Sequence, residues 1–90
     1  MVKEREALAE LQARLRVAIA ARGISLASLA MRARLGRTTV SQALNGHGRP
    51  SLNTLMALCQ TLRMDQPDLD RLLELWRVIG AADGRRSDLM

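Results

Sequence analysis

Apolar residues recur along this chain at spacings of three and four, which is the period of an amphipathic α-helix. The first stripe runs from Leu8 to Ile19, and later stretches repeat the pattern. Capping and turn residues separate these stretches, so they predict separate helices. The predicted helices span residues 3–22, 26–33, 37–45, 52–63 and 67–79.

The predicted boundaries rest on residues that favour helix ends. Ser25 and Ser51 are good N-caps, and Pro67 suits the first turn of the last helix. Gly23 and Gly80 suit the position that follows a helix. Together they indicate short connections between the helices.

The composition fits a small helical domain with an aliphatic core. Hydrophobic residues make up 48% of the 90 residues, and Trp76 is the only aromatic one. Residues that favour helices are common, and β-branched residues are few. We therefore expect one all-α domain over residues 1–80, followed by a polar, weakly ordered tail over residues 81–90.

The predicted helix 37–45 has a polar face without an acid. At about 100° per residue, the side chains able to form hydrogen bonds fall within an arc of roughly 140°. They are Arg37, Thr38, Ser41, Gln42 and Asn45, and Val40, Ala43 and Leu44 lie on the opposite side. Solvated helix faces usually mix acids and bases, so this face favours contact with an anionic partner over plain solvation.

The last predicted helix carries more apolar residues than one packing contact needs. Its apolar arc spans roughly 220°, whereas a helix that covers one core needs little more than about 100°. The excess indicates either deep burial in the domain or an interface with a second chain. The candidate dimer residues are Leu75, Trp76, Val78 and Ile79, with helix 3–22 as the second choice.

The charge is distributed unevenly along the chain. The formal net charge is +5, and no acid occurs between Leu11 and Met64, a segment that contains many arginines. A long field of one sign suits a polyanion such as nucleic acid. The alternative is an arginine-rich composition with chance clustering of the acids.

Residues that could support catalysis or bind a metal are few and scattered. His47 is the only histidine and has no second ligand at suitable spacing. Cys59 falls on the apolar face of helix 52–63, where we expect it in the core. No serine has a base and an orienting acid nearby, so we expect neither an enzyme nor a cofactor. The sequence has no signal-peptide pattern and no apolar run long enough for a membrane, which favours a cytoplasmic protein.

Helices 26–33 and 37–45, with the tight turn between them, form a helix-turn-helix pattern over residues 25–46. Short motifs around it occur in a fixed order: Gly23-Ile24-Ser25, Leu29-Ala30, Leu35, Thr38-Thr39-Val40-Ser41, Asn45-Gly46 and Pro50-Ser51-Leu52-Asn53-Thr54-Leu55. In these motifs, residues 23–62 resemble the Xre family of phage-repressor-like DNA-binding domains.

The resemblance implies a compact five-helix, lambda-repressor-like fold with helix 37–45 in the major groove of DNA. By position, it implies that Arg37, Thr38 and Gln42 face base edges, with Ser41 on the same face. The residues implied to lie at phosphates are Thr39, Asn45, Gly46, Arg49 and His47. The side-chain chemistry agrees, because arginine suits guanine, glutamine suits adenine and helix N-termini suit phosphates.

Two positions depart from the family pattern. Arg34 stands in the turn where the family usually has glycine, and a positive φ at a non-glycine residue costs on the order of 1 kcal/mol. We therefore expect a reshaped turn in which Gly36 absorbs the bend. Leu26 stands where the family often has a phosphate-contacting glutamine, so no contact is assigned there.

The sequence thus favours a sequence-specific DNA-binding transcriptional regulator. We expect a homodimer on an inverted repeat, with the two copies of helix 37–45 about 34 Å apart. The alternative is an antitoxin-like or adaptor module whose main partner is another protein, because one fold can carry many functions.

Overall fold

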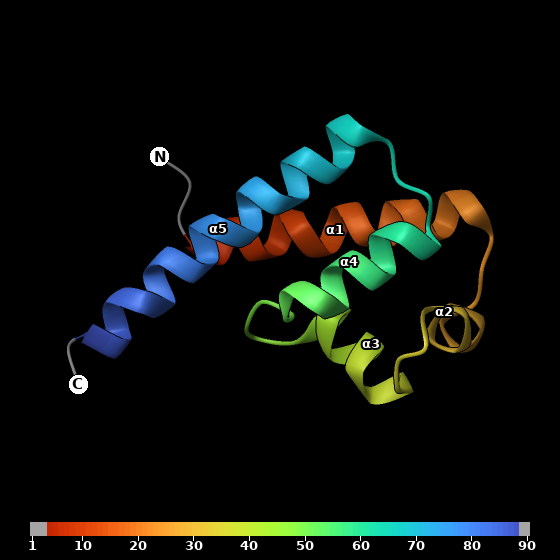
Figure 1. Ribbon diagram of the computed structural model, residues 1–90, viewed down its shortest axis with the longest axis horizontal. Helices are drawn as coiled ribbons and strands as arrows, with labels where there is room; N and C mark the ends of the chain where they lie inside the picture. Colours follow the sequence, from red (N-terminus) through yellow and green to blue (C-terminus); the bar gives the residue numbers. More distant parts are fainter. Residues whose placement is uncertain (1–3, 89–90) are drawn as a thin grey trace.

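A computed structural model of the protein describes the backbone of residues 4–88 and the side chains of residues 4–80. All regular structure in this range is helical, which confirms the predicted fold class. Figure 1 shows the long helices α1 and α5 lying against each other, with α3 at the lower edge of the view. The helices are α1 (Glu4–Arg22), α2 (Leu26–Ala33), α3 (Arg37–Asn45), α4 (Leu52–Thr61) and α5 (Gln66–Asp88).

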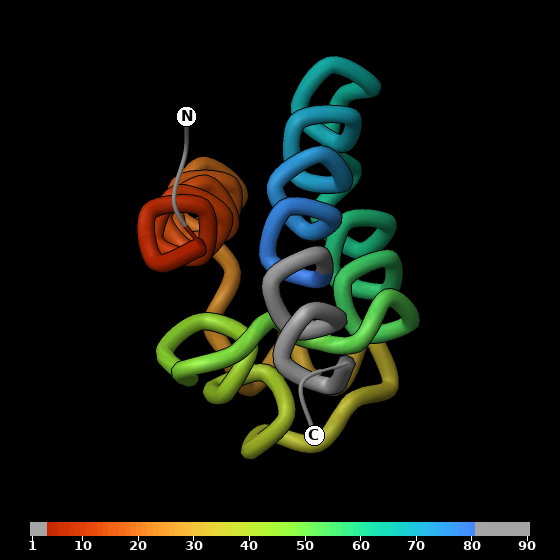
Figure 2. The backbone as a smooth tube through the Cα atoms, turned by 90° about the vertical axis from the view of Figure 1, so that its left-hand side faces the viewer, coloured from red at the N-terminus to blue at the C-terminus, as the bar shows by residue number. Residues whose placement is uncertain are grey.

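Helix α1 packs against α5 along much of its length and also against α3, while α2 packs on α3 and α4. Figure 2 shows α1 nearly end-on, with α5 beside it. The core between them is aliphatic, as expected. The hydrophobic side chains that are at most 3% exposed are Ala7, Leu11, Leu15, Leu29, Ala30, Val40, Ala43, Leu44, Leu55, Leu58, Cys59, Leu62, Leu72, Leu75 and Ile79.

The wide apolar arc of α5 is explained by burial within the domain. Leu75 and Ile79, two of the predicted dimer residues, are each 1% exposed and belong to the core. Trp76 and Val78 are half-buried and pack against that core. The expected dimer surface on these four residues therefore needs correction, because its two most buried members cannot reach a second chain.

Helix α5 does not end at Ile79 as predicted. It continues through Gly80 to Asp88, so residues 81–88 of the predicted tail are helical, and residues 89–90 lie outside the described residues. Glycine inside a helix costs only about 1 kcal/mol, which is too little to end a helix whose earlier turns pack on a core. Gly80 provides space instead, because a Cβ there would overlap the guanidinium of Arg49.

An ion-pair network joins α1 to α5. Arg71 donates two hydrogen bonds to the Glu10 carboxylate, at 2.8 and 2.9 Å, and Arg14 donates another at 2.8 Å. These two arginines, Arg71 above all, lower the pKa of Glu10 to about 2. The side chains of Glu10 and Arg71 are about a third exposed, so the network aligns the two helices more than it stabilises the fold.

The turn between α2 and α3 keeps a regular helix-ending geometry. Arg34 adopts the left-handed conformation, with φ 59° and ψ 43°, and the Leu35 N–H donates to the carbonyl oxygen of Ala30 at 2.9 Å. Gly36 is extended, with φ −70°, so the expectation that it absorbs the bend was wrong. Packing of Leu35 against the core explains why the turn holds its shape. Arg63 adopts the same conformation after α4, which therefore ends before residue 63.

Replacing Arg34 by glycine should stabilise the protein. Glycine removes the steric cost of the left-handed conformation, so we expect the free energy of unfolding to rise by about 1 kcal/mol. In a thermal melt followed by circular dichroism, the midpoint should rise by about 4–8 °C. The control is Arg32→Gly in the last turn of α2, which should lower the stability by about 1 kcal/mol. A lower midpoint for Arg34→Gly would show that the arginine side chain contributes more than the strain costs.

Candidate nucleic-acid interface

Helix α3 presents its polar face to solvent, which confirms the predicted orientation. Val40, Ala43 and Leu44 are at most 3% exposed and fix the helix to the core. Because α3 lies at the edge of the molecule, its other side is open to a partner (Figure 1). The exposed side chains of this helix are Arg37, Thr38, Thr39, Ser41, Gln42 and Asn45.

The N-terminal end of α3 lacks the cap that α2 and α4 carry. Ser25 accepts a hydrogen bond from the Ser28 N–H, and Ser51 accepts one from the Thr54 N–H, both at 3.1 Å. These bonds confirm the two predicted N-caps. Gly36, at the same place before α3, has no side chain to accept such a bond. The first N–H groups of α3 are thus available to an anion such as phosphate.

The C-terminal end of α3 is held by α1. Gln12, only 9% exposed, donates to the carbonyl oxygen of Gly46 at 3.0 Å. Arg16 donates to the carbonyl oxygen of Leu44 at 2.6 Å and also to Oδ1 of Asn45. Carbonyls at a helix C-terminus have no partner within the helix, and the helix dipole favours a cation there. Side chains of α1 therefore provide hydrogen-bond donors for the carbonyl groups at this end of α3 and fix its orientation.

Asn45 and Gly46, both predicted at phosphates, differ in what they can offer. The bond from Arg16 occupies Oδ1 of Asn45 and leaves its Nδ2 as a donor. The Gly46 N–H donates to the carbonyl oxygen of Gln42 at 2.7 Å, and its own carbonyl accepts from Gln12. Gly46 has a steric role, because a Cβ there would lie 2.5 Å from the Gln42 oxygen. Of these two residues, only Asn45 keeps a hydrogen-bond donor that a phosphate could accept from.

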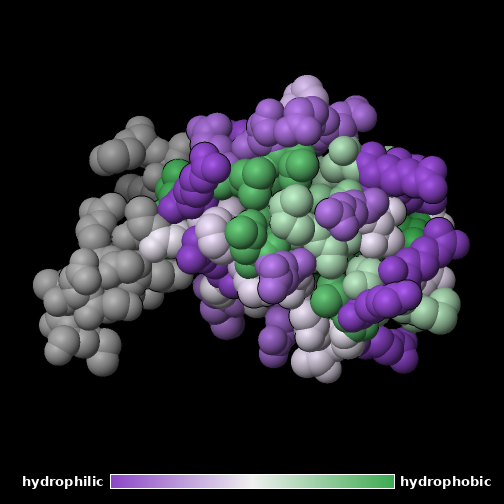
Figure 3. All heavy atoms as spheres, viewed as in Figure 1, coloured by the Kyte–Doolittle hydropathy of each residue, from purple (hydrophilic) through white to green (hydrophobic). Residues whose placement is uncertain are grey.

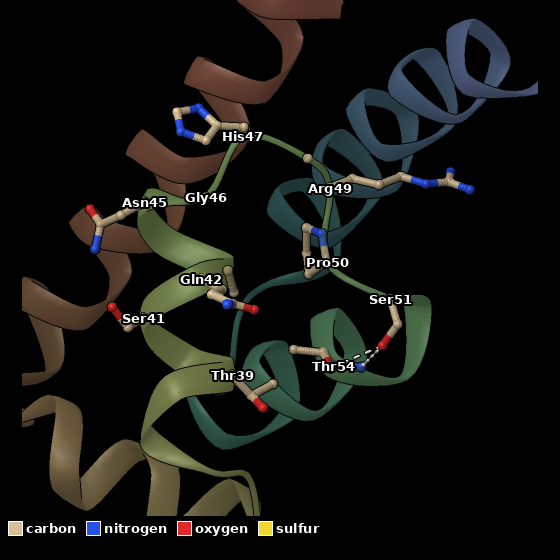
Figure 4. A pocket seen from close by; sticks show the side chains of 12 residues that line it. Thr39, Ser41, Gln42, Asn45, Gly46, His47, Arg49, Pro50, Ser51 and Thr54 are labelled. Carbon is tan, nitrogen blue, oxygen red and sulfur yellow. Dashed lines mark hydrogen bonds between the residues drawn. The ribbon is translucent and has the colours of Figure 1, made fainter. Parts of the chain in front are cut away.

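A hollow of about 600 Å³ lies between α3, the following loop and the start of α4. Thr39, Ser41, Gln42 and Asn45 all help to line it. Figure 4 shows Thr39 and Gln42 leaving α3 towards the loop and the start of α4, whereas Ser41 and Asn45 leave it on the opposite side of the view. The polar face of α3 is therefore broad enough to touch a partner along both flanks. His47 is exposed in the loop above the hollow.

Arg49 is engaged by α5. Its side chain extends away from α3, as Figure 4 shows. The Nη1 group donates to the carbonyl oxygen of Trp76 at 3.0 Å, and the guanidinium carbon lies 3.5 Å from the centroid of the indole ring. Of the two loop residues predicted at phosphates, His47 is thus accessible and Arg49 already has a partner.

The described residues offer little other chemistry. Burial raises the pKa of the Cys59 thiol to about 11, so this core residue stays protonated at neutral pH. Across the part of the chain that the structure describes, no three His, Cys, Asp or Glu side chains gather where a metal ion could bind. Within the same residues, no helix combines the length and apolar content needed to cross a membrane.

Sequence reasoning missed the roles of Gln12 and Arg16. A signal was present, because Gln12 lies beside the apolar stripe of α1 and Arg16 follows four residues later on the same helix face. A polar residue next to such a stripe indicates a hydrogen bond with another element. The partners are 28 to 34 residues away along the chain, so local pattern could not identify them.

Replacing Gly46 by alanine should destabilise the end of α3. The new Cβ would meet the backbone oxygen of Gln42 at 2.5 Å, and relief would strain the bond from Gln12 to Gly46. In urea denaturation, we expect a loss of about 1–3 kcal/mol in the free energy of unfolding. The matched control is Gly48→Ala, where nothing lies within 4 Å of the new Cβ, and the change should stay within about 0.5 kcal/mol. Equal stabilities of the two variants would contradict this steric role.

Comparison with known proteins identifies the family to which this chain belongs. A profile of Cro/C1-type HTH DNA-binding domains matches residues 14–72, which include all of α2, α3 and α4. A search of curated proteins and a search of solved structures found no match. The matched segment covers more than half of the chain and contains the helix pair that exposes α3, so the protein belongs to the family of Cro/C1-type HTH DNA-binding domains.

Proposed function

We propose that the protein is a sequence-specific transcriptional regulator that reads DNA with α3 in the major groove. Its family supports DNA binding in general. The observation that carries the finer proposal is the face of α3, which is exposed, free of acids and uncapped at its N-terminus. A major groove about 12 Å wide admits a helix of this kind.

Four side chains of α3 are assigned to base edges. Arg37 can donate two hydrogen bonds to guanine, and Gln42 can pair with adenine. Thr38 can offer its hydroxyl to a base or its methyl group to thymine, and Ser41 lies one turn from Arg37. All four side chains are exposed, so binding breaks no core contact.

Phosphate contacts are assigned to both ends of α3. Thr39 and the uncapped N–H groups serve the N-terminal end. Nδ2 of Asn45 and the exposed His47 serve the C-terminal end, where Arg16 adds positive charge. Gly46 supports this end by its shape, since its N–H is used within the protein.

Alanine at Arg37 or Gln42 should reduce sequence-specific binding. Each change removes a side chain that pairs with one base, so we expect a loss of about 1–3 kcal/mol and a relaxed preference at one base pair. The measurement is binding to a duplex that the wild-type protein selects from a random pool, and to its single-base-pair variants.

The control for these variants is Arg77→Ala, which removes the same charge from the exposed surface of α5. It should change affinity for all sequences alike and leave the base preference intact. If both α3 variants bind the selected duplex as wild type does, the assigned base-reading face is wrong.

The proposal includes a homodimer on an inverted repeat, and α1 provides its surface. Since Leu75 and Ile79 lie in the core, helix α1, the second choice from the sequence, becomes the first candidate for the dimer surface. Val17 on α1 is 69% exposed beside a hollow of about 560 Å³ that Leu62 and Met64 help to line. A two-fold axis can place each Val17 in the hollow of the other copy. Charged residues of both signs also line this hollow, so that acids of one copy can pair with arginines of the other. They are Glu10, Arg14, Arg22, Arg63, Asp65 and Asp68.

Replacing Val17 by aspartate should therefore shift the protein towards monomer. A carboxylate at the centre of an apolar contact loses its hydration on association, which costs far more than at an open site. Sedimentation velocity over a range of micromolar concentrations would measure the shift. Met31→Asp is the matched control, because Met31 is 73% exposed on α2, outside this surface. A Val17→Asp protein that associates like wild type would exclude α1 as the dimer surface.

A second candidate function is a module whose main partner is another protein. Figure 3 shows hydrophobic residues gathered in the middle of one face among hydrophilic ones. Large apolar side chains on different helices are open to solvent, such as Leu52 at 42% and Met31 at 73% exposed. Such surface often marks protein contacts. Co-purification with a partner protein, together with no affinity of the wild-type chain for DNA, would favour this function.

A further inference from the structure

The loop between α3 and α4 is tied to α5 by contacts in both directions. Arg49 from the loop donates to the carbonyl oxygen of Trp76 at 3.0 Å and stacks on its indole, 3.5 Å from the ring centroid. The indole Nε1 donates back to the carbonyl oxygen of Pro50 at 2.8 Å. One turn further along α5, Gly80 leaves the space that the guanidinium occupies. These four residues form the Arg49–Trp76 clamp.

The clamp fixes the loop from the side of α5. Trp76 is half-buried against the core, so its ring is a rigid platform for the loop. A planar guanidinium over an indole is among the stronger cation–π pairs, and it has a preferred stacked geometry. From the side of α1, Gln12 holds the same loop at Gly46. The loop that carries His47 is thus held at both ends.

We propose that Arg49 and Trp76 are positioning residues for DNA binding. The clamp sets the course of the chain after α3, and Arg49 stays on Trp76 when DNA is bound. This inference rests on the proposed function, because positioning matters only if the loop meets DNA. It assigns Arg49 a role different from the phosphate contact that its place in the sequence implies. Loss of the clamp should weaken binding without removing a phosphate contact.

The discriminating variant is Gly80→Ala. Its Cβ would displace the Arg49 guanidinium from the clamp, while both Arg49 and Trp76 remain in the chain. Alanine also favours the helix more than glycine does, so the variant should fold. If Arg49 contacts phosphate, releasing it from Trp76 leaves DNA binding unchanged or tighter. If the clamp positions the loop, the same release weakens binding.

The experiment compares wild type, Gly80→Ala and Arg49→Met on a 30-base-pair duplex that the wild-type protein selects from a random pool. Dissociation constants are measured by fluorescence anisotropy between about 50 and 200 mM salt. Both variants should bind about three- to tenfold more weakly, which is the scale of one cation–π contact. The slope of log affinity against log salt should match wild type, whereas loss of a phosphate contact flattens it by about 0.9.

The emission of Trp76 provides a second readout, because the chain has one tryptophan and no tyrosine or phenylalanine. In the free proteins, both variants should show the same shift in emission relative to wild type, since both release the indole from the guanidinium. Saturating wild type with the duplex should leave its emission maximum in place, because the clamp persists in the complex.

Three results would overturn the positioning role. They are wild-type affinity or better in Gly80→Ala, a flattened salt slope in Arg49→Met alone, and a wild-type emission that moves to that of the variants on adding DNA. Circular dichroism melts of each variant establish that binding is compared between folded proteins. Failure of the proposed function gives a different result, in which wild type itself selects and binds no duplex, and the positioning role falls with it.

Discussion

The carbonyl groups at the C-terminal ends of the short helices set the constraint on which this structure depends. A helix end leaves such groups without partners, and burying them unsatisfied would cost about twice the net gain of one hydrogen bond. Helix α1 supplies donors for two of these ends. Arg16 serves Leu44 at the end of α3, and Arg22 donates to Leu62 at 2.8 Å, after α4. The direction in which α3 points therefore depends on side chains of α1, a helix for which the sequence predicted no contact with DNA.

This use of arginine changes the interpretation of the basic, acid-free segment. Arg16 and Arg22 donate to carbonyl oxygens at helix C-terminal ends, where a carboxylate would be repelled by the partial negative charge. Arg49 donates to the carbonyl oxygen of Trp76 within α5, and a carboxylate has no hydrogen to donate there. Part of the acid-free composition thus follows from the fold itself. Arg37 differs from them, because it stands in the first turn of α3, where a cation is opposed by the helix dipole. An arginine at this position does not stabilise the helix through the dipole, and this supports its proposed role in contacting DNA.

Local patterns predicted most of the fold, and long-range contacts explain what they missed. Ser25 and Ser51 cap helices through residues three positions away, so their roles were visible in the sequence. Arg34 was misjudged because packing of the next residue against the core outweighs a strain of about 1 kcal/mol. Gly80 resembled a helix end because its partner, Arg49, lies in a distant loop. The exposed face of α3 was predictable from periodicity, whereas the supports at either end of the following loop were not.

The supports of α3 use backbone acceptors, and this separates its stability from its specificity. Gln12 and Arg16 bind carbonyl oxygens that remain the same whatever side chains α3 carries. Among the described contacts that hold α3 and its loop, none uses the side chains of Arg37 or Gln42. Substitutions on the proposed base-reading face are therefore expected to change which sequence is bound while the helix keeps its orientation. Asn45 is the exception, because its side chain accepts a hydrogen bond from Arg16 and is also proposed to contact phosphate, so a change there is expected to affect both support and contact.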